Sequence, residues 1–275
     1  MKKILIVGAG AMGAAFSIPL LDNGHSVVLT EPYNFKLLKK LNSKKKYHPS
    51  LNINLPKKLK INKFSSDILN RNWDLIVIAV SSIGIDLIGK NLSKIKNKSP
   101  ILVLTKGLKL DGRNLISMSS LLRKYNKNLN ISVLKGPCLA KELAKKVKSF
   151  TVVANKNINT AKKIGKLIST NYYQTEFSRD VNGVEFLSAI KNIYSMIIGA
   201  GQWHNTSSAL FRKSIDEMKY LANYFKGKKE TVYGLAGLGD LYVSAMGGRN
   251  SKMGEYLGKG YTFTQAKKKF MKNDT

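Results

Sequence analysis

The first two thirds of the chain alternates short apolar runs with segments whose apolar residues follow a helical spacing. The apolar runs are rich in Ile, Leu and Val and cover residues 4–7, 26–30, 75–80, 101–104, 131–134 and 150–154. The helical spacing recurs at 12–21, 34–41, 84–92, 115–125 and 140–146. Strands that alternate with helices predict a parallel sheet covered on both faces, a doubly wound α/β fold. Residues 42–65, rich in lysine and asparagine, are expected to form a loop or short edge strands.

The pattern changes near residue 180, where the strand-like runs end. Segments of helical length follow at 185–198, 207–225, 241–246, 251–257 and 263–270. We therefore predict two domains, an α/β domain over residues 1–180 and an all-helical domain over residues 181–275.

A glycine motif stands between the first predicted strand and the first predicted helix. Gly8, Gly10 and Gly13 form G-x-G-x-x-G, and a second strand follows the helix. In this context the motif is typical of a Rossmann-type dinucleotide site, where the N–H groups of the first helical turn, at Ala11 and Met12, face a pyrophosphate. The alternative is a glycine-rich turn that serves only the fold.

An acidic residue ends the second predicted strand. Glu31 lies 18 residues after Gly13, where its carboxylate can accept hydrogen bonds from the adenosine ribose and would repel a 2′-phosphate. Glu31 therefore favours NAD over NADP. The alternatives are a surface glutamate before Pro32, or a 2′-phosphate held by Lys36.

Polar and glycine residues follow three other predicted strands. Ser81-Ser82, Thr105-Lys106-Gly107 and Gly136-Pro137-Cys138 each stand at a strand's carboxyl end. Since ligands of open α/β sheets bind at this edge, we expect these segments to border the site.

Lys191 stands in a nearly apolar helical segment, residues 184–198. Burying a lysine is costly unless it is paired or its pKa falls, and a buried lysine can exchange protons with a substrate. The alternative, a lysine whose ammonium reaches the surface, stays open at this point. The S-x-x-K spacing of Ser188 and Lys191 also occurs in penicillin-binding enzymes, but no other motif of that class accompanies it.

A second glycine-rich segment covers residues 234–250. Glycines ahead of a helix present backbone donors to an anion, and Asp240 is expected at the start of that helix. Arg249 and Asn250 follow two glycines and suit the recognition of a phosphate. The alternative is a purely structural loop.

The formal net charge of +31 is the most unusual feature of the composition. It comes from 41 lysines and only six arginines, beside 24 asparagines, whereas proteins that recognise nucleic acids favour arginine. We interpret the charge as a solvated lysine-rich surface and expect no nucleic-acid partner. One cysteine excludes an internal disulfide, and the three scattered histidines do not suggest a metal cluster. The residues contain no membrane-spanning run and no signal peptide, so a cytoplasmic location is expected.

Together these motifs resemble the NAD(P)-dependent glycerol-3-phosphate dehydrogenase family. The stretches that carry the resemblance are GAGAMG (8–13), TKGL (105–108), GPCLAKELA (136–144), VEFLSAIKNIYSMIIGAG (184–201), GLAGLGDL (234–241) and GGRN (247–250). They follow the family order across nearly the whole chain.

The resemblance implies a reversible, NAD(P)H-dependent reduction of dihydroxyacetone phosphate to sn-glycerol 3-phosphate that supplies glycerophospholipid synthesis. It implies Lys191 as the proton donor and acceptor, with Lys106 and Asp240 completing the catalytic centre. NAD is the expected cofactor with NADP not excluded, no metal is expected, and a homodimer is expected. The implied cofactor positions are Gly8, Gly10, Ala11, Met12, Gly13, Glu31, Lys106, Ala140 and Arg249. The implied substrate positions are Lys106, Gly136, Lys191, Asn192, Asp240, Ser244, Arg249 and Asn250.

The chain departs from the family pattern in three places. Cys138 stands where many members have serine, Lys213-Ser214 replaces a common Arg-Gly pair, and Thr30-Glu31-Pro32 replaces a triplet with a basic residue. Family chains also continue through further helical sequence, so we expect the helical domain here to be truncated.

Two other functions compete with this interpretation. One is a reductase of ketopantoate or another β-hydroxyacid precursor, against which the glycine-rich segment with Arg249 and Asn250 argues. The other is a nucleic-acid-binding or NAD-sensing protein without catalysis, which a steep salt dependence of DNA affinity would indicate.

Overall fold

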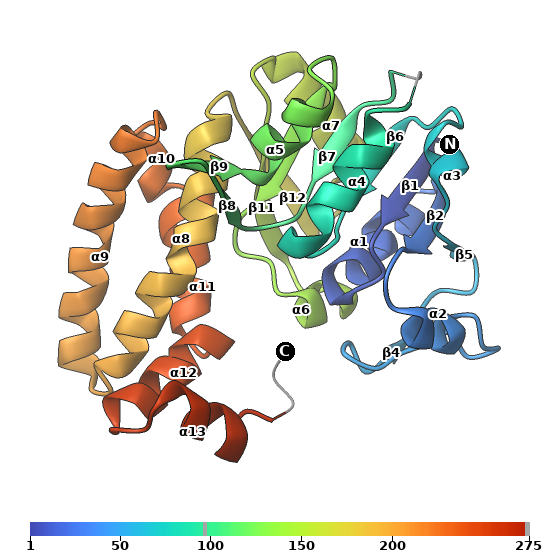
Figure 1. The fold of residues 1–275 in the computed structure, drawn as a ribbon. Helices are drawn as coiled ribbons and strands as arrows, with labels where there is room; N and C mark the ends of the chain where they lie inside the picture. The colour runs from blue at the N-terminus through green and yellow to red at the C-terminus, as the bar shows by residue number, and fades with distance from the viewer. Residues whose placement is uncertain (96–97, 273–275) are drawn as a thin grey trace. The chain divides into compact units, whose positions relative to one another are not determined.

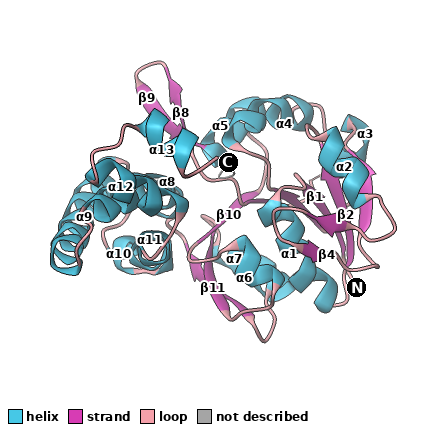
Figure 2. Cartoon of the chain, turned by 90° about the horizontal axis from the view of Figure 1, so that it is seen from below, coloured by secondary structure: helices cyan, strands magenta, loops and turns pink. Residues whose placement is uncertain are grey.

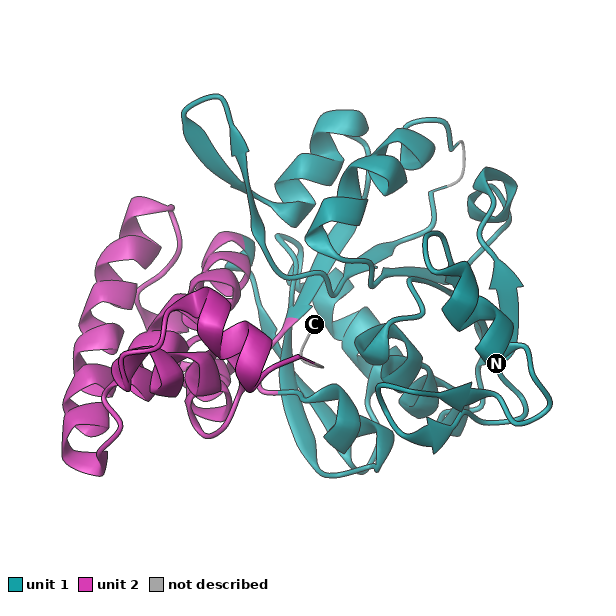
Figure 3. Cartoon of the chain, turned by 60° about the horizontal axis from the view of Figure 1, so that its bottom comes forward, with its two compact units in different colours: residues 1–134, 138–181 teal, residues 135–137, 182–275 magenta. Residues whose placement is uncertain are grey.

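The protein, described here from a computed structural model, consists of two compact units (Figure 3). The structure describes residues 1–95 and 98–272, so residues 273–275 of the expected helical domain lie outside it. The first unit comprises Met1–Leu134 and Cys138–Val181, and the second comprises Lys135–Pro137 and Asn182–Thr275.

The first unit is built on an eight-stranded sheet. In spatial order its strands are β12 (Tyr173–Ser178), β11 (Ser149–Ala154), β10 (Ile131–Lys135), β7 (Ile101–Val103), β6 (Leu75–Ile78), β1 (Lys3–Val7), β2 (Ser26–Glu31) and β5 (Lys60–Lys63). The pairings of β1 with β2 and β6, and of β7 with β6 and β10, are parallel. All four residues of β6 are buried, because a parallel sheet is covered on both faces. The predicted α/β fold is confirmed.

Helices cover both faces of this sheet (Figure 2). Helices α4 (Ile85–Leu92) and α5 (Met118–Tyr125) pack together on one face. Helices α1 (Ala11–Asp22), α6 (Ala140–Ala144) and α7 (Ile158–Ile168) lie on the other. The strand order reverses between β1 and β6, because the chain runs outward through β2 to β5 before returning to β6. The carboxyl ends of strands at such a switch point border the ligand crevice of a doubly wound sheet.

The region predicted as one helix over residues 115–125 begins as a strand. Residues Asn114–Ser117 form β9, paired antiparallel with β8 (Leu108–Asp111), and α5 begins only at Met118. Gly112 allows the tight turn of this hairpin with a φ of +59°, and the Ser117 hydroxyl caps α5. The apolar residues of β9 fitted a helical spacing because the strand is only four residues long.

Residues 42–65 contain short strands and pack on the core. Of the two expectations, a loop or short edge strands, the second is confirmed. They contain the hairpin of β3 (Tyr47–His48) and β4 (Ile53–Asn54), which follows α2 (Phe35–Leu41), and the edge strand β5. Between these strands the side chains of Leu51, Leu55 and Leu59 are buried in the same core as α1. The segment is therefore anchored despite its polar composition. Helix α3 (Ser66–Leu69) leads from it to β6.

The described part of the second unit is helical, as predicted (Figure 1). Its elements are α8 (Val181–Ala200), α9 (His204–Tyr224), α10 (Glu230–Tyr233), the π-helical turn η2 (Leu235–Gly239), α11 (Asp240–Ala245), α12 (Arg249–Gly258) and α13 (Phe263–Lys269). Helices α8 and α12 cross at backbone contact distance, since a Cβ on Gly254 would collide with the carbonyl oxygen of Met196. Stacked rings of Tyr256 and Phe270, 4.4 Å apart at their centroids, join α12 to the end of the chain's last helix. Among the described residues, no helix combines the length and the apolar character that crossing a bilayer requires.

A pair of variants tests whether residues 42–65 are anchored. Leu59→Ala should lower the free energy of unfolding by about 2–5 kcal/mol, because it opens a cavity at a side chain that is 1% exposed. The neighbouring exposed Lys58→Ala should stay within about 0.5 kcal/mol of the parent. Urea unfolding followed by circular dichroism measures both values, and equal midpoints for the two variants would contradict the anchoring.

Candidate functional site

The glycine motif forms a turn between β1 and α1 that leaves room for an anion. Gly8 has a φ of +110°, and a Cβ on it would lie 2.6 Å from the carbonyl carbon of Ala79, which follows β6. A Cβ on Gly13 would strike the carbonyl oxygen of Gly8, whereas Gly10 is exposed and faces open space. Gly10 precedes α1 and supplies no side-chain cap to its first N–H groups. The turn thus fits the pyrophosphate of a dinucleotide, and a side chain at Gly10 would occupy that space.

The Glu31 carboxylate is buried against this turn. Its Oε2 accepts a hydrogen bond from the Ala9 N–H at 2.7 Å, and its Oε1 accepts from the N–H groups of Tyr33 and Asn34 at 2.9 and 3.0 Å. A carboxylate offers about four lone-pair sites, so roughly one remains, on Oε2. Its predicted contact with the ribose has to use that site, and stays a prediction.

His48 contacts the same turn, although no sequence pattern indicates this contact. The Leu51 N–H donates to His48 Nδ1 at 3.3 Å, so the proton lies on Nε2, which donates to the Ala9 carbonyl at 3.0 Å. The ring is fully buried, and burial lowers the pKa of His48. We counted His48 only as a scattered histidine, because 39 residues separate it from Ala9.

Two of the segments expected at one edge of the sheet, those that follow β6 and β7, contact each other. The Thr105 hydroxyl donates to the Val80 carbonyl at 2.7 Å, and a Cβ on Gly107 would touch Ser82 at 3.0 Å. Lys106, which stands between Thr105 and Gly107 in the sequence, is half-buried. Of the remaining predicted cofactor and substrate positions, Ala140 begins α6, and Gly136, with a φ of +126°, groups with the second unit.

In the second unit Lys191 is buried and paired, rather than reaching the surface. It is 7% exposed, and Asp240, the first residue of α11, is 1% exposed. The Lys191 Nζ donates to Asp240 Oδ1, to Ser244 Oγ at 2.7 Å, and to the Asp240 carbonyl at 3.4 Å. An ammonium has three donor protons, so this geometry engages all of them.

Ser188, the first residue of the S-x-x-K spacing, completes this cluster. Its hydroxyl donates to Asp240 Oδ2 at 3.1 Å, and the residue has no exposed surface. Residues three apart in a helix lie on one face, so the S-x-x-K spacing did signal that Ser188 and Lys191 share partners. The two oxygens of Asp240 are thereby held by two different side chains of α8.

Three further predicted substrate residues, Asn192, Arg249 and Asn250, belong to α8 and α12 of the second unit, and their role stays a prediction. The Gly248 N–H donates to the Ser244 carbonyl at 3.1 Å, which places Arg249 and Asn250, at the start of α12, near the end of α11. Arg249 is exposed and Asn250 is half-buried. Asn192 follows Lys191 in α8 and is exposed.

The glycine-rich segment before α11 was expected to present backbone N–H groups to an anion, and two of its glycines do not. It forms η2, in which the N–H groups of Gly237 and Gly239 both donate to the Gly234 carbonyl, each at 3.2 Å. These two donors are satisfied within the segment, so they are not presented to an anion. The expected start of the next helix at Asp240 is confirmed.

Comparison with known proteins identifies the family. The sequence model described as the N-terminus of NAD-dependent glycerol-3-phosphate dehydrogenase matches residues 3–161, and the model of its C-terminus matches residues 180–274. The chain belongs to the NAD-dependent glycerol-3-phosphate dehydrogenase family. It is an oxidoreductase of that NAD(P)-dependent family, as the resemblance predicted.

Relatives match over most of their length. The NADP(+)-dependent glycerol-3-phosphate dehydrogenase of Archaeoglobus fulgidus is 30% identical over 96% of this chain and 82% of its own. The glycerol-3-phosphate dehydrogenase [NAD(P)+] of Clostridium botulinum strain Alaska E43 is 31% identical over 97% of this chain and 82% of its own. The crystal structure of glycerol-3-phosphate dehydrogenase from Coxiella burnetii is 26% identical, with a TM-score of 0.86 over 98% of this chain and 84% of that one.

The buried ion pair predicts an asymmetric response to substitution. Asp240→Ala leaves the Lys191 ammonium buried without its carboxylate, so the free energy of unfolding should fall by about 3–5 kcal/mol. Adding Lys191→Met removes the charge and should recover most of that loss.

Urea unfolding of the single and double variants measures the effect. Asp216→Ala provides the control, because it removes the acid of an exposed ion pair with Arg212 on α9 and should cost at most about 1 kcal/mol. A double variant as unstable as Asp240→Ala would show that the pairing is not what stabilises Lys191.

Proposed function

We propose that this chain catalyses the reversible NAD(P)H-dependent reduction of dihydroxyacetone phosphate to sn-glycerol 3-phosphate. The observation that carries the proposal is the buried Lys191–Asp240 pair. The family resemblance implies Lys191 as the proton donor and acceptor, and Asp240 as part of the catalytic centre. The bound cofactor supplies a hydride to the ketone carbon of the substrate. Lys191 supplies the proton that the carbonyl oxygen needs as its negative charge develops.

Lys191 is proposed to lose a proton when the substrate is reduced and to gain one when it is oxidised. In reduction, the carbonyl oxygen gains one proton from the ammonium, which becomes a neutral amine and is reprotonated from solvent. In oxidation, the neutral amine takes the proton of the substrate hydroxyl. Because all three ammonium protons are engaged, substrate has to replace one acceptor, and the 3.4 Å contact with the Asp240 carbonyl is the longest of the three.

Asp240 and Ser244 hold this proton carrier in place. The carboxylate stabilises the ammonium form, and the Ser244 hydroxyl accepts from Nζ while donating to the Asp240 carbonyl at 2.8 Å. We propose that Lys106 completes the catalytic centre, as the resemblance implies.

The anionic substrate is proposed to bind to cationic and amide side chains. Arg249 and Asn250 suit a phosphate because a guanidinium donates two parallel hydrogen bonds to it. Support comes from their place at the start of α12, next to the end of α11 that carries Ser244. The proposed set also includes Lys106, Gly136 and Asn192.

The cofactor is proposed to lie on residues 8–13, with further contacts from Ala140, Lys106 and Arg249. The open space at Gly10 supports this placement. We propose that NAD is preferred over NADP, because Glu31 is a buried carboxylate at the end of β2 and would repel a 2′-phosphate.

The cellular setting follows from the reaction. We propose that the chain acts in the cytoplasm as a homodimer that supplies sn-glycerol 3-phosphate for glycerophospholipid synthesis, without a nucleic-acid partner. The lysine-rich character of its charge supports the last point.

A substrate and cofactor panel tests the proposed reaction. The chain should oxidise NADH with dihydroxyacetone phosphate but not with ketopantoate, and kcat/KM should be higher with NADH than with NADPH. Lys191→Ala should lower kcat by about 10² or more, the usual range for a general acid. Absorbance at the nicotinamide band follows each reaction. Turnover of ketopantoate alone would overturn the substrate, and an unchanged kcat would remove Lys191 from the mechanism.

Ser188 is proposed as a positioning residue for the Asp240 carboxylate. Ser188→Ala removes the donor to Oδ2, so we expect kcat to fall about three- to tenfold, while the KM for dihydroxyacetone phosphate stays within twofold. Ser195→Ala is the matched control, since Ser195 is equally buried on α8 but donates only to the Asn192 carbonyl. Equal kcat values for the two variants would show that Ser188 only packs.

A further inference from the structure

Two side chains from separate parts of the first unit hold the backbone of Ala9. Glu31, at the end of β2, accepts from the Ala9 N–H at 2.7 Å, and His48, in β3, donates to the Ala9 carbonyl at 3.0 Å. The N–H and the carbonyl of one residue belong to successive peptide planes. The two peptide planes on either side of the Ala9 Cα, the second of which leads into Gly10, are therefore both fixed by contacts with other elements.

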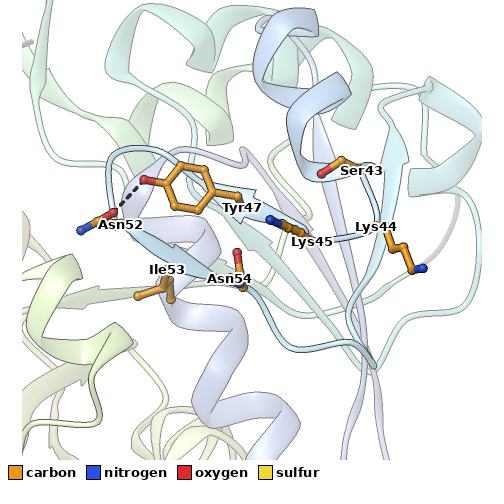
Figure 4. A pocket seen from close by; sticks show the side chains of 7 residues that line it. All are labelled: Ser43, Lys44, Lys45, Tyr47, Asn52, Ile53 and Asn54. Atoms are coloured by element: carbon orange, nitrogen blue, oxygen red, sulfur yellow. Dashed lines mark hydrogen bonds between the residues drawn. The ribbon is translucent and has the colours of Figure 1, made fainter.

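The hairpin that carries His48 is itself tied down (Figure 4). The Tyr47 hydroxyl donates to Asn52 Oδ1 at 2.7 Å, and the Asn52 N–H closes the turn on the His48 carbonyl at 2.9 Å. On the same segment Lys46 Nζ donates to the carbonyls of Lys57 and Leu59, at 2.8 and 2.6 Å. The imidazole is thus a fixed donor, because its hairpin is braced on both sides.

The chemical state of His48 suits a constant donor. Its Nδ1 accepts the Leu51 N–H, which fixes the neutral form with the proton on Nε2. The ring has no exposed surface, so no water can replace it at the Ala9 carbonyl. Ala9 is fully buried as well, so loss of the donor would leave its carbonyl unsatisfied.

We propose that His48 is a positioning residue for the cofactor, because it holds the turn of residues 8–13 in the shape that receives the pyrophosphate. It acts through the Ala9 carbonyl and does not touch the cofactor. The proposal rests on the assignment of residues 8–13 as the cofactor turn. It implies that the segment of residues 42–65, far from the motif in sequence, determines part of the affinity for the dinucleotide.

Two substitutions separate the two hydrogen bonds of the imidazole. In His48→Gln the amide nitrogen reaches the place of Nε2 and keeps the donor to Ala9, while the acceptor for Leu51 is lost. In His48→Asn the amide oxygen takes the place of Nδ1 and keeps the acceptor for Leu51, while the donor to Ala9 is lost. Each variant loses one hydrogen bond, so a purely structural role predicts equal effects.

The measurement is the Kd of NADH, from the fluorescence of NADH titrated with each protein in the absence of substrate. We expect His48→Asn to raise Kd about three- to tenfold, and His48→Gln to stay within about twofold of the parent. The urea midpoints of the two variants should fall by similar amounts. In turnover, His48→Asn should raise the KM for NADH and leave kcat at saturating NADH within twofold.

The outcomes are distinguishable. Equal Kd values for the Asn and Gln variants, or an unchanged Kd in His48→Asn, would overturn the role of His48. Failure of the parent chain to bind NADH would instead overturn the assignment of residues 8–13.

A second measurement on the parent chain covers the case in which the variants do not fold. Nitrogen NMR of the His48 ring should show a neutral ring protonated on Nε2, and its signal should shift when NADH is added but not when inorganic phosphate is added. A His48 signal that is indifferent to NADH would count against the proposal.

Discussion

A buried ammonium needs a negatively charged partner close by, and the arrangement of α8, η2 and α11 in the second unit supplies one. Lys191 is buried in a largely apolar helix, so its charge depends on Asp240 from α11. Asp240 in turn needs α11 to begin close to α8, and the compact π-helical turn η2 leads directly into that start. Ser188 and Ser244 then satisfy the remaining oxygen and the remaining proton. The same contacts that make the burial tolerable also orient the lysine that we propose as proton carrier.

In the first unit, the turn of residues 8–13 that we propose as the cofactor site depends on its backbone rather than on side-chain chemistry. A turn that offers N–H groups to an anion must keep its shape, and it can carry no side chain in the space that the anion occupies. Gly8 and Gly13 allow that shape, since a Cβ at either would collide with neighbouring backbone. The rigidity that glycines do not supply comes from Glu31 and His48, which hold the two peptide planes of Ala9.

The sequence predicted those features that a local pattern encodes. The strand–glycine–helix motif and the helix start at Asp240 follow from spacing within one element, and the structure has both. The apolar spacing around Lys191 left its burial open, and only the structure decides it. Contacts made across the fold were not predictable in this way. The contact between His48 and Ala9 spans 39 residues, and that between Ser188 and Asp240 spans 52. The hairpin of β8 and β9 was missed for a local reason, since four residues are too few to distinguish a strand from a helical turn.

Two buried carboxylates show how the surroundings divide roles between similar groups. Glu31 accepts only from backbone N–H groups, which cannot give up their protons, so it acts as a fixed structural acceptor. Asp240 accepts from an ammonium and a hydroxyl, and the ammonium does have a proton to transfer. Burial alone therefore does not mark a catalytic acid in this chain. What separates the two is a partner that can exchange a proton, and the buried Lys191 that we propose as proton carrier is such a partner.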